Sequence, residues 1–245
     1  LSGCFKHAVF RDCDSLTSVV VRVGVTNIPD YMFSGCRSLR NVALPDTVLN
    51  IGISVFDSCC MLTTIGLPRR LTSISQRTFQ DCTSLKYVTI PQGATVIDSD
   101  AFNGCWSLRN VTLPDTVTFI GVSAFKSCRV LANIVLPQSL KCIESRMFQG
   151  CTSLKYVTIP QGTTSIGSEA FNGCSSLKFV AIPNSLNYVH SENVFDHSTI
   201  NTIVFNSCRA AALFPQTFFS KMDNLRSVVC VSDCGSVRDP LDHSG

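Results

Sequence analysis

Cysteine is the residue type with the most chemistry to offer in this chain. The 245 residues include 14 cysteines, and eight of them recur at every twenty-third position. If the repeats stack at strand spacing, successive copies lie about 5 Å apart, within reach of a disulfide. Stacked side chains point in parallel, however, which disfavours the crossed geometry that a disulfide needs. We therefore expect these eight to be mostly free thiols of a core column, namely Cys13, Cys36, Cys59, Cys82, Cys105, Cys128, Cys151 and Cys174.

The remaining cysteines offer fewer possibilities. Cys230 and Cys234 are the candidates for a disulfide near the C-terminal end, with Cys208 nearby in the sequence. Cys60 directly follows a column cysteine, which places it in a surface slot as a free thiol. No paired C-x-x-C motif is present, so we expect no metal site.

Catalytic and cofactor motifs are absent as well. The sequence has no G-x-S-x-G, no glycine-rich phosphate loop and no H-E-x-x-H. His190 with Glu192, and Asp196 with His197, have no spacing typical of a helical metal site, and we expect them in solvated loops. We therefore predict no enzyme, no catalytic residue and no cofactor.

Basic and aromatic residues recur at two other positions of the repeat. The residue after each repeat leucine is basic in six of ten cases and never acidic, although only 20 of 245 residues are Lys or Arg. The next position holds three aromatic residues. The candidate partner-binding residues are thus Arg40, Lys86, Tyr87, Arg109, Lys155, Tyr156, Lys178 and Phe179.

These residues are positioned by a 23-residue repeat that reads F-x-x-C-x-x-L-x-x-V-x-I-P-x-x-V-x-x-I-x-x-x-A-F. Leu85, Val88 and Ile90 form the strand core of a leucine-rich repeat, and alternation turns Tyr87 and Thr89 outward. A proline then ends the strand. We expect the return side to consist of short extended pieces and turns, with one helical turn around the Ala-Phe. Stacked coils bury Phe, Cys, Leu, Val and Ile as continuous columns.

A three-repeat duplication lies on top of this period. Residues 80–102 match residues 149–171 at 18 of 23 positions, a shift of three repeats. The copied surface residues are therefore not independent, and the basic row could equally be side chains that solubilise the sheet.

The pattern divides the chain into four parts. Residues 1–9 are expected to be the end of a truncated preceding repeat, and residues 10–205 hold the regular repeats. Residues 206–234 are expected to form a degenerate last repeat and cap, followed by a polar tail at 235–245. Because the numbered chain starts in mid-repeat, we expect it to be a fragment of a longer array.

The repeats resemble a known family. Units such as Ala170-Phe-Asn-Gly-Cys-Ser-Ser-Leu177 followed by Phe179-Val-Ala-Ile-Pro183 are similar to the BspA-like leucine-rich repeats, also called the Treponema pallidum type. The resemblance covers roughly residues 5–230. It implies a curved solenoid with a parallel sheet on its concave face. It also implies that the chain comes from a surface or secreted protein of a host-associated microbe, and that this protein adheres to matrix proteins or to other cells.

Composition limits the function classes further. The net charge of +3 argues against a nucleic-acid partner, and no apolar run is long enough to span a membrane. We predict a leucine-rich-repeat solenoid of about ten coils that acts as a cell-surface or secreted binding module. Its partner would be a protein or an acidic glycan. The alternatives are a structural spacer, or a cytoplasmic scaffold or effector that uses the same face.

Overall fold

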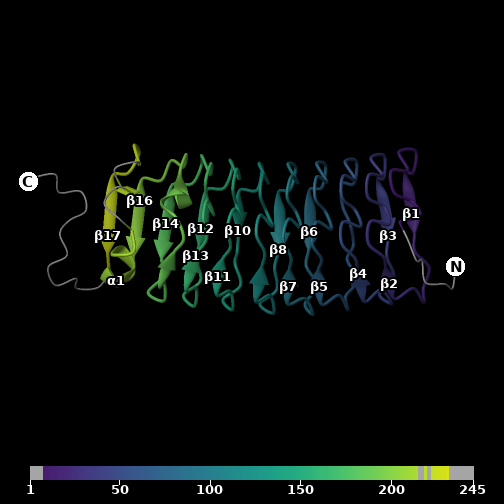
Figure 1. The fold of residues 1–245 in the computed structure, drawn as a ribbon, viewed down its shortest axis with the longest axis horizontal. Helices are drawn as coiled ribbons and strands as arrows, with labels where there is room; N and C mark the ends of the chain where they lie inside the picture. The colour runs from purple at the N-terminus through teal and green to yellow at the C-terminus, as the bar shows by residue number, and fades with distance from the viewer. Residues whose placement is uncertain (1–7, 215–217, 220–221, 232–245) are drawn as a thin grey trace, which may run out of the picture.

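The computed structural model describes residues 8–214, 218–219 and 222–231, and it forms a solenoid of stacked coils. Figure 1 shows one long, narrow stack that runs from the N-terminal end on the right to the C-terminal end on the left. All strand pairs in the described residues are parallel, as expected when each coil repeats the path of the one before it. The predicted leucine-rich-repeat solenoid is confirmed.

One side of the stack is built from strands of three or four residues, apart from the two-residue β10, and we call these the longer strands. These contain the Val of each L-x-x-V-x-I segment and pair with the same position of the next coil, for example Val19 with Val42 and Tyr156 with Phe179. They form three parallel groups, and the third coil contributes only an isolated bridge between Thr64 and Tyr87. The strands are β1 (Ser18–Val20), β3 (Asn41–Ala43), β6 (Tyr87–Thr89), β8 (Asn110–Thr112), β10 (Asn133–Ile134), β12 (Tyr156–Thr158), β14 (Phe179–Ile182), β16 (Thr202–Phe205) and β17 (Ser227–Cys230).

The return side is built from strands of two residues each, which confirms the expected short extended pieces. Their second residue is an Ile or Val that points into the core, whereas the first is exposed or half-buried. They are β2 (Asn27–Ile28), β4 (Asn50–Ile51), β5 (Ser73–Ile74), β7 (Val96–Ile97), β9 (Phe119–Ile120), β11 (Cys142–Ile143), β13 (Ser165–Ile166) and β15 (Tyr188–Val189).

The helical turn expected at each Ala-Phe is wrong for most coils. A 3-10 helix, η1 (Glu192–Phe195), occurs at this place in one coil, and Phe218 and Phe219 are helical at the same place of the last coil. Another short helix, α1 (Cys208–Ala211), precedes them. Elsewhere the residue two before the Phe is left-handed, as at Ser123 (φ 57°) and Arg146 (φ 57°), which interrupts a helix. The Phe amides donate to the next coil instead, for example Phe102 N to Ala124 O at 2.8 Å.

Phenylalanine forms the central column of the core. From Phe10 to Phe195 the rings stack on their neighbours with centroids 5.3–5.7 Å apart and interplanar angles of 1–15°. A stacked aromatic pair adds about 0.5–1.5 kcal/mol beyond the burial of its area. The column therefore joins each coil to the next along most of the stack.

Cysteine forms a second column beside it. Each buried thiol of the column donates a hydrogen bond to the carbonyl oxygen of the Phe one coil earlier, as Cys82 Sγ does to Phe56 O (3.0 Å) and Cys105 Sγ to Phe79 O (3.1 Å). All eight column thiols are free, and seven are fully buried. The expectation of free core thiols is confirmed. The regular columns end near the C-terminal coils, where Phe205, Phe214, Phe218 and Phe219 pack edge-on or tilted against one another.

Candidate binding face

We define the long-strand face as the outward side chains of the longer strands and of the residue just before each strand. Side-chain alternation creates it: in β6, Tyr87 and Thr89 are exposed while Val88 between them is buried. Each coil contributes one rung of four residues, of which the third points into the core and the other three belong to this face. The ten rungs are residues 17–20, 40–43, 63–66, 86–89, 109–112, 132–135, 155–158, 178–181, 201–204 and 226–229.

The structure brings the predicted basic residues together on this face. They are all exposed and stand at the same position of different rungs, as Arg40, Lys86, Arg109, Lys155 and Lys178. Backbone hydrogen bonds hold neighbouring rungs in register at this position, as from Arg109 N to Lys86 O (2.9 Å). The row is therefore anchored by the backbone, and only the flexible side chains extend into solvent.

No ion pair between described residues neutralises the basic row. The ion pairs found among the described residues lie elsewhere, between Arg11 and Asp12, Arg69 and Asp46, Arg77 and Asp100, and Arg146 and Glu169. Within the row, Lys178 Nζ donates a hydrogen bond to Thr199 Oγ1 (3.0 Å). An acidic partner would thus meet cations that need not first break an ion pair of the described chain.

The predicted aromatic residues stand beside the cations. Tyr87, Tyr156 and Phe179 are exposed by 52%, 60% and 37%, which is unusual for aromatic side chains in a chain with so large a core. Tyr156 and Phe179 are register partners on neighbouring rungs, and Tyr87 is the register partner of Asn110. The face therefore combines cationic groups with aromatic ring surface, and two of its residue types, Tyr and Arg, are enriched at interface hot spots.

A shallow hollow of about 610 Å³ interrupts the face at the third rung. Gly66 leaves it open, because a Cβ built there would meet no atom within 4 Å. Tyr87, Thr64 and Arg69 are among the residues around it. The matching position three rungs later is Val135, whose side chain is 83% exposed.

Sequence reasoning missed one exposed cluster at the side of the stack. Trp106 is 45% exposed, and the Arg129 guanidinium of the next coil lies 4.7 Å from its ring centroid. Both residues occupy the position after a column cysteine, so the repeat spacing could have placed them on adjacent coils. Their stacking depends on side-chain conformations that the spacing does not specify.

The cysteines expected to pair near the C-terminal end are arranged differently. Cys230 is an exposed free thiol in β17, which differs from the expected Cys230–Cys234 disulfide, and Cys234 lies outside the described residues. Cys208 at the start of α1 is disulfide-bonded instead. Cys60 is a half-buried free thiol, more enclosed than the surface slot predicts. Within the described ranges, no group of three or more His, Cys, Asp and Glu residues could hold a metal ion.

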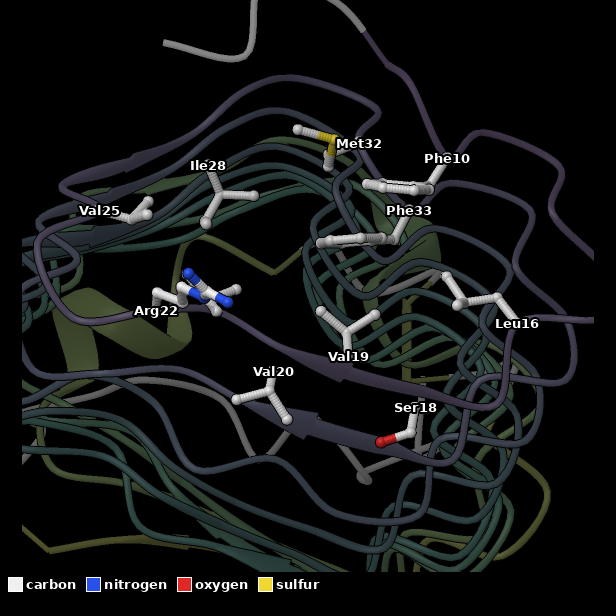
Figure 2. A pocket seen from close by; sticks show the side chains of 11 residues that line it. Phe10, Leu16, Ser18, Val19, Val20, Arg22, Val25, Ile28, Met32 and Phe33 are labelled. Carbon is white, nitrogen blue, oxygen red and sulfur yellow. The ribbon is translucent and has the colours of Figure 1, made fainter. Parts of the chain in front are cut away.

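An apolar hollow lies at the N-terminal end of the described stack, with a volume of about 440 Å³. Figure 2 shows Phe10 above Phe33, with Val19, Ile28 and Met32 lining the same space. Phe10 is only half-buried, whereas the column rings from the third coil onward have almost no exposed surface. The hollow thus lies at the N-terminal end of the core columns of the described residues. It has none of the basic residues of the long-strand face.

Comparison with known proteins supports the repeat assignment. The family described as BspA type leucine rich repeat region matches residues 5–132 and 95–226, in six copies. No curated protein matches the chain. In the described residues, no helix is long and apolar enough to cross a membrane.

Three solved structures share the fold. A Bacteroides ovatus leucine-rich repeat protein is 23% identical with a TM-score of 0.71 over 92% of this chain and 63% of its own. A leucine rich cell surface protein of Faecalibacterium prausnitzii is 28% identical with a TM-score of 0.55, covering 89% of this chain and 65% of its own. The T. pallidum leucine rich repeat protein is 34% identical with a TM-score of 0.61, covering 66% of this chain and 78% of its own. The chain therefore spans less than two thirds of the first two.

Proposed function

This chain belongs to the BspA type leucine-rich repeat family, and on that premise we propose that it is a non-enzymatic binding module of a cell-surface or secreted protein. Its partner is a protein or a glycan with acidic groups, and the complex serves adhesion or recognition of another cell. One observation carries the proposal: the long-strand face presents exposed aromatic rings beside a row of cations that form no ion pair with any residue the structure describes. A surface location is supported by the similarity to a leucine rich cell surface protein of Faecalibacterium prausnitzii.

The mechanism follows from the placement of the charges. Arg40, Lys86, Arg109, Lys155 and Lys178 attract an acidic partner over distances of about a Debye length, roughly 8–10 Å at moderate salt. Tyr87, Tyr156 and Phe179 then supply contact area, because amphipathic or apolar rings bury surface at a low cost in side-chain entropy. The parallel sheet below keeps the row in place, so little ordering of the backbone opposes binding.

Retention on immobilised heparin across a salt gradient tests the proposal. The wild type is expected to bind and to elute with rising salt, whereas a variant with Lys86→Glu, Arg109→Glu and Lys155→Glu is expected to flow through while still folded. The matched control reverses three exposed basic residues outside the face, with Arg37→Glu, Arg70→Glu and Lys141→Glu. It carries the same net charge as the face variant.

The outcomes separate the functions. Elution of the control close to the wild type, with loss of retention only in the face variant, supports a binding face. If the two triple variants behave alike, the basic row has no special role and the structural spacer becomes the better interpretation of the same fold.

A further inference from the structure

The charges on the long-strand face follow a period of three rungs. From the second rung to the tenth, every third rung is uncharged and the others are basic. The uncharged rungs begin with Thr63, Ala132 and Asn201. The basic rungs begin with Arg40, Lys86, Arg109, Lys155, Lys178 and Arg226.

Two of the resulting units are complete. The first combines Lys86 and Tyr87 with Arg109, and the second combines Lys155 and Tyr156 with the Lys178–Phe179 rung. In each unit the two rungs are direct register neighbours, through Tyr87 with Asn110 and Tyr156 with Phe179. We call them the first subsite (residues 86–87 and 109–110) and the second subsite (residues 155–156 and 178–179).

Duplication alone does not account for the second subsite. Residues 149–171 still match residues 80–102 at 18 of 23 positions, but residues 172–194 match residues 103–125 at only 7 of 23. Those seven include column and turn positions such as Gly104, Cys105, Leu108, Val111 and Pro114. Lys178 stands where the other copy has Arg109, so this diverged coil keeps a basic residue there although most of its outward positions differ.

The spacing of the subsites points to the shape of the partner. Rungs about 4.8 Å apart place the two subsites roughly 14 Å apart along the stack. A linear polymer with a repeated acidic unit presents identical groups along one line, whereas the surface of a folded protein does not. The net charge of +3 and the pI of about 8.2 are low for a nucleic-acid module, so the polymer that fits is a polysaccharide.

We propose that the long-strand face is bivalent and that its two subsites hold successive acidic units of one linear glycan chain lying along the stack. This rests on the proposed function and deepens it. Each subsite binds acidic groups through its two cations, and the Tyr or Phe ring packs against the C–H face of a sugar. Joining two weak sites through one chain raises the affinity by the effective concentration of the second unit.

Calorimetric titration with heparin oligosaccharides of increasing length tests bivalency. The wild type is expected to bind two short oligosaccharides per chain. Once the oligosaccharide spans both subsites, the stoichiometry should fall to one and the affinity should rise at least tenfold. Variants that remove one subsite, Lys86→Ala with Arg109→Ala or Lys155→Ala with Lys178→Ala, should bind one oligosaccharide at every length and lose that rise. The double substitution Arg70→Ala with Lys141→Ala is the matched control, and this variant should retain the rise in affinity with oligosaccharide length.

The outcomes distinguish this inference from the proposed function. Binding that is weakened by both subsite variants but strengthens smoothly with length at constant stoichiometry would overturn bivalency and leave the acidic-partner face standing. If the wild type binds no heparin oligosaccharide of any length, both the bivalent face and the proposed acidic-partner function are overturned. Tighter binding of oligo-dT than of heparin at equal charge would overturn the glycan assignment in favour of single-stranded nucleic acid.

Discussion

Two glycines show how the coil stack controls single positions. Gly66 lies on the long-strand face, where a Cβ would enter open space. Gly167 follows β13, where a Cβ would overlap the backbone nitrogen of Ser145 in the preceding coil. The first position therefore tolerates a side chain, whereas the second depends on the absence of one.

We expect Gly66→Ala to leave the free energy of unfolding unchanged or to raise it by up to about 1 kcal/mol, because the unfolded chain loses freedom and nothing clashes. Gly167→Ala should lower it by about 1–3 kcal/mol, because the neighbouring backbone must move. Urea unfolding of the two variants beside the wild type measures both values. Equal effects of the two substitutions would contradict the close approach of the coils at Gly167.

At the scale of the elements, the thiols of the cysteine column share one environment, because each is buried in the core between neighbouring coils. Burial raises the pKa of Cys36 to about 11 and that of Cys174 to about 12. The thiols of Cys82, Cys105 and Cys128, deeper in the stack, have their pKa raised well above the ordinary value by the same desolvation. The column therefore keeps its protons in the folded state at pH values where exposed thiols lose them.

This difference predicts alkaline destabilisation. Unfolded thiols ionise near pH 8.5–9 while the folded column stays protonated, so the unfolded state binds fewer protons and stability falls as pH rises. Each column thiol contributes at most about 1.4 kcal/mol per pH unit, from roughly pH 9 up to its folded pKa. Urea midpoints between pH 7.5 and 10.5 should therefore decline.

A variant isolates the contribution of one thiol. Cys128→Val should decline less steeply than the wild type, whereas Cys230→Ala should follow the wild-type slope, because the Cys230 thiol is exposed to water in the folded state too. Parallel curves for the wild type and Cys128→Val would show that the column does not carry this pH dependence.

The columns and the outward row could be predicted from the sequence because each is a residue type at a fixed position of the 23-residue repeat. The turns before each Phe could not. Ser123 and Arg146 adopt left-handed backbone although neither residue type favours it, since their amides bond to Ser145 O and Ser168 O of the next coil. The Trp106–Arg129 contact and the state of Cys208 likewise depend on three-dimensional packing between segments.

At the scale of the whole molecule, the repeated coil path makes stability depend on neighbouring coils. Where strands pair on this face, they join a rung to the adjacent rung, one repeat away along the chain in the regular part of the stack. Removing whole coils should then shorten the molecule without changing the packing of those that remain.

Deletion of residues 80–148 tests this property. It removes three whole repeats, and it joins Phe79 to Gln149, which replaces Gln80 with the same residue type. The shortened chain is expected to unfold cooperatively, with a denaturant slope reduced by roughly a quarter, because that slope scales with the surface exposed on unfolding. Deletion of residues 80–142 breaks the columns and serves as the control. If the chain lacking residues 80–142 folds, or if the chain lacking residues 80–148 does not, the dependence of stability on neighbouring coils is contradicted.

The buried thiols can report the order in which the coils unfold. Each coil from Cys36 to Cys174 places one cysteine of its column in the interior, closed off by the coils on either side. A coil that opens exposes its own thiol to a brief pulse of alkylating reagent, while closed coils keep theirs. The mass of the pulsed chain would increase by one adduct for each column thiol exposed, above the adducts of accessible thiols such as Cys230. Peptide mapping of the column thiols would show from which end the opening began.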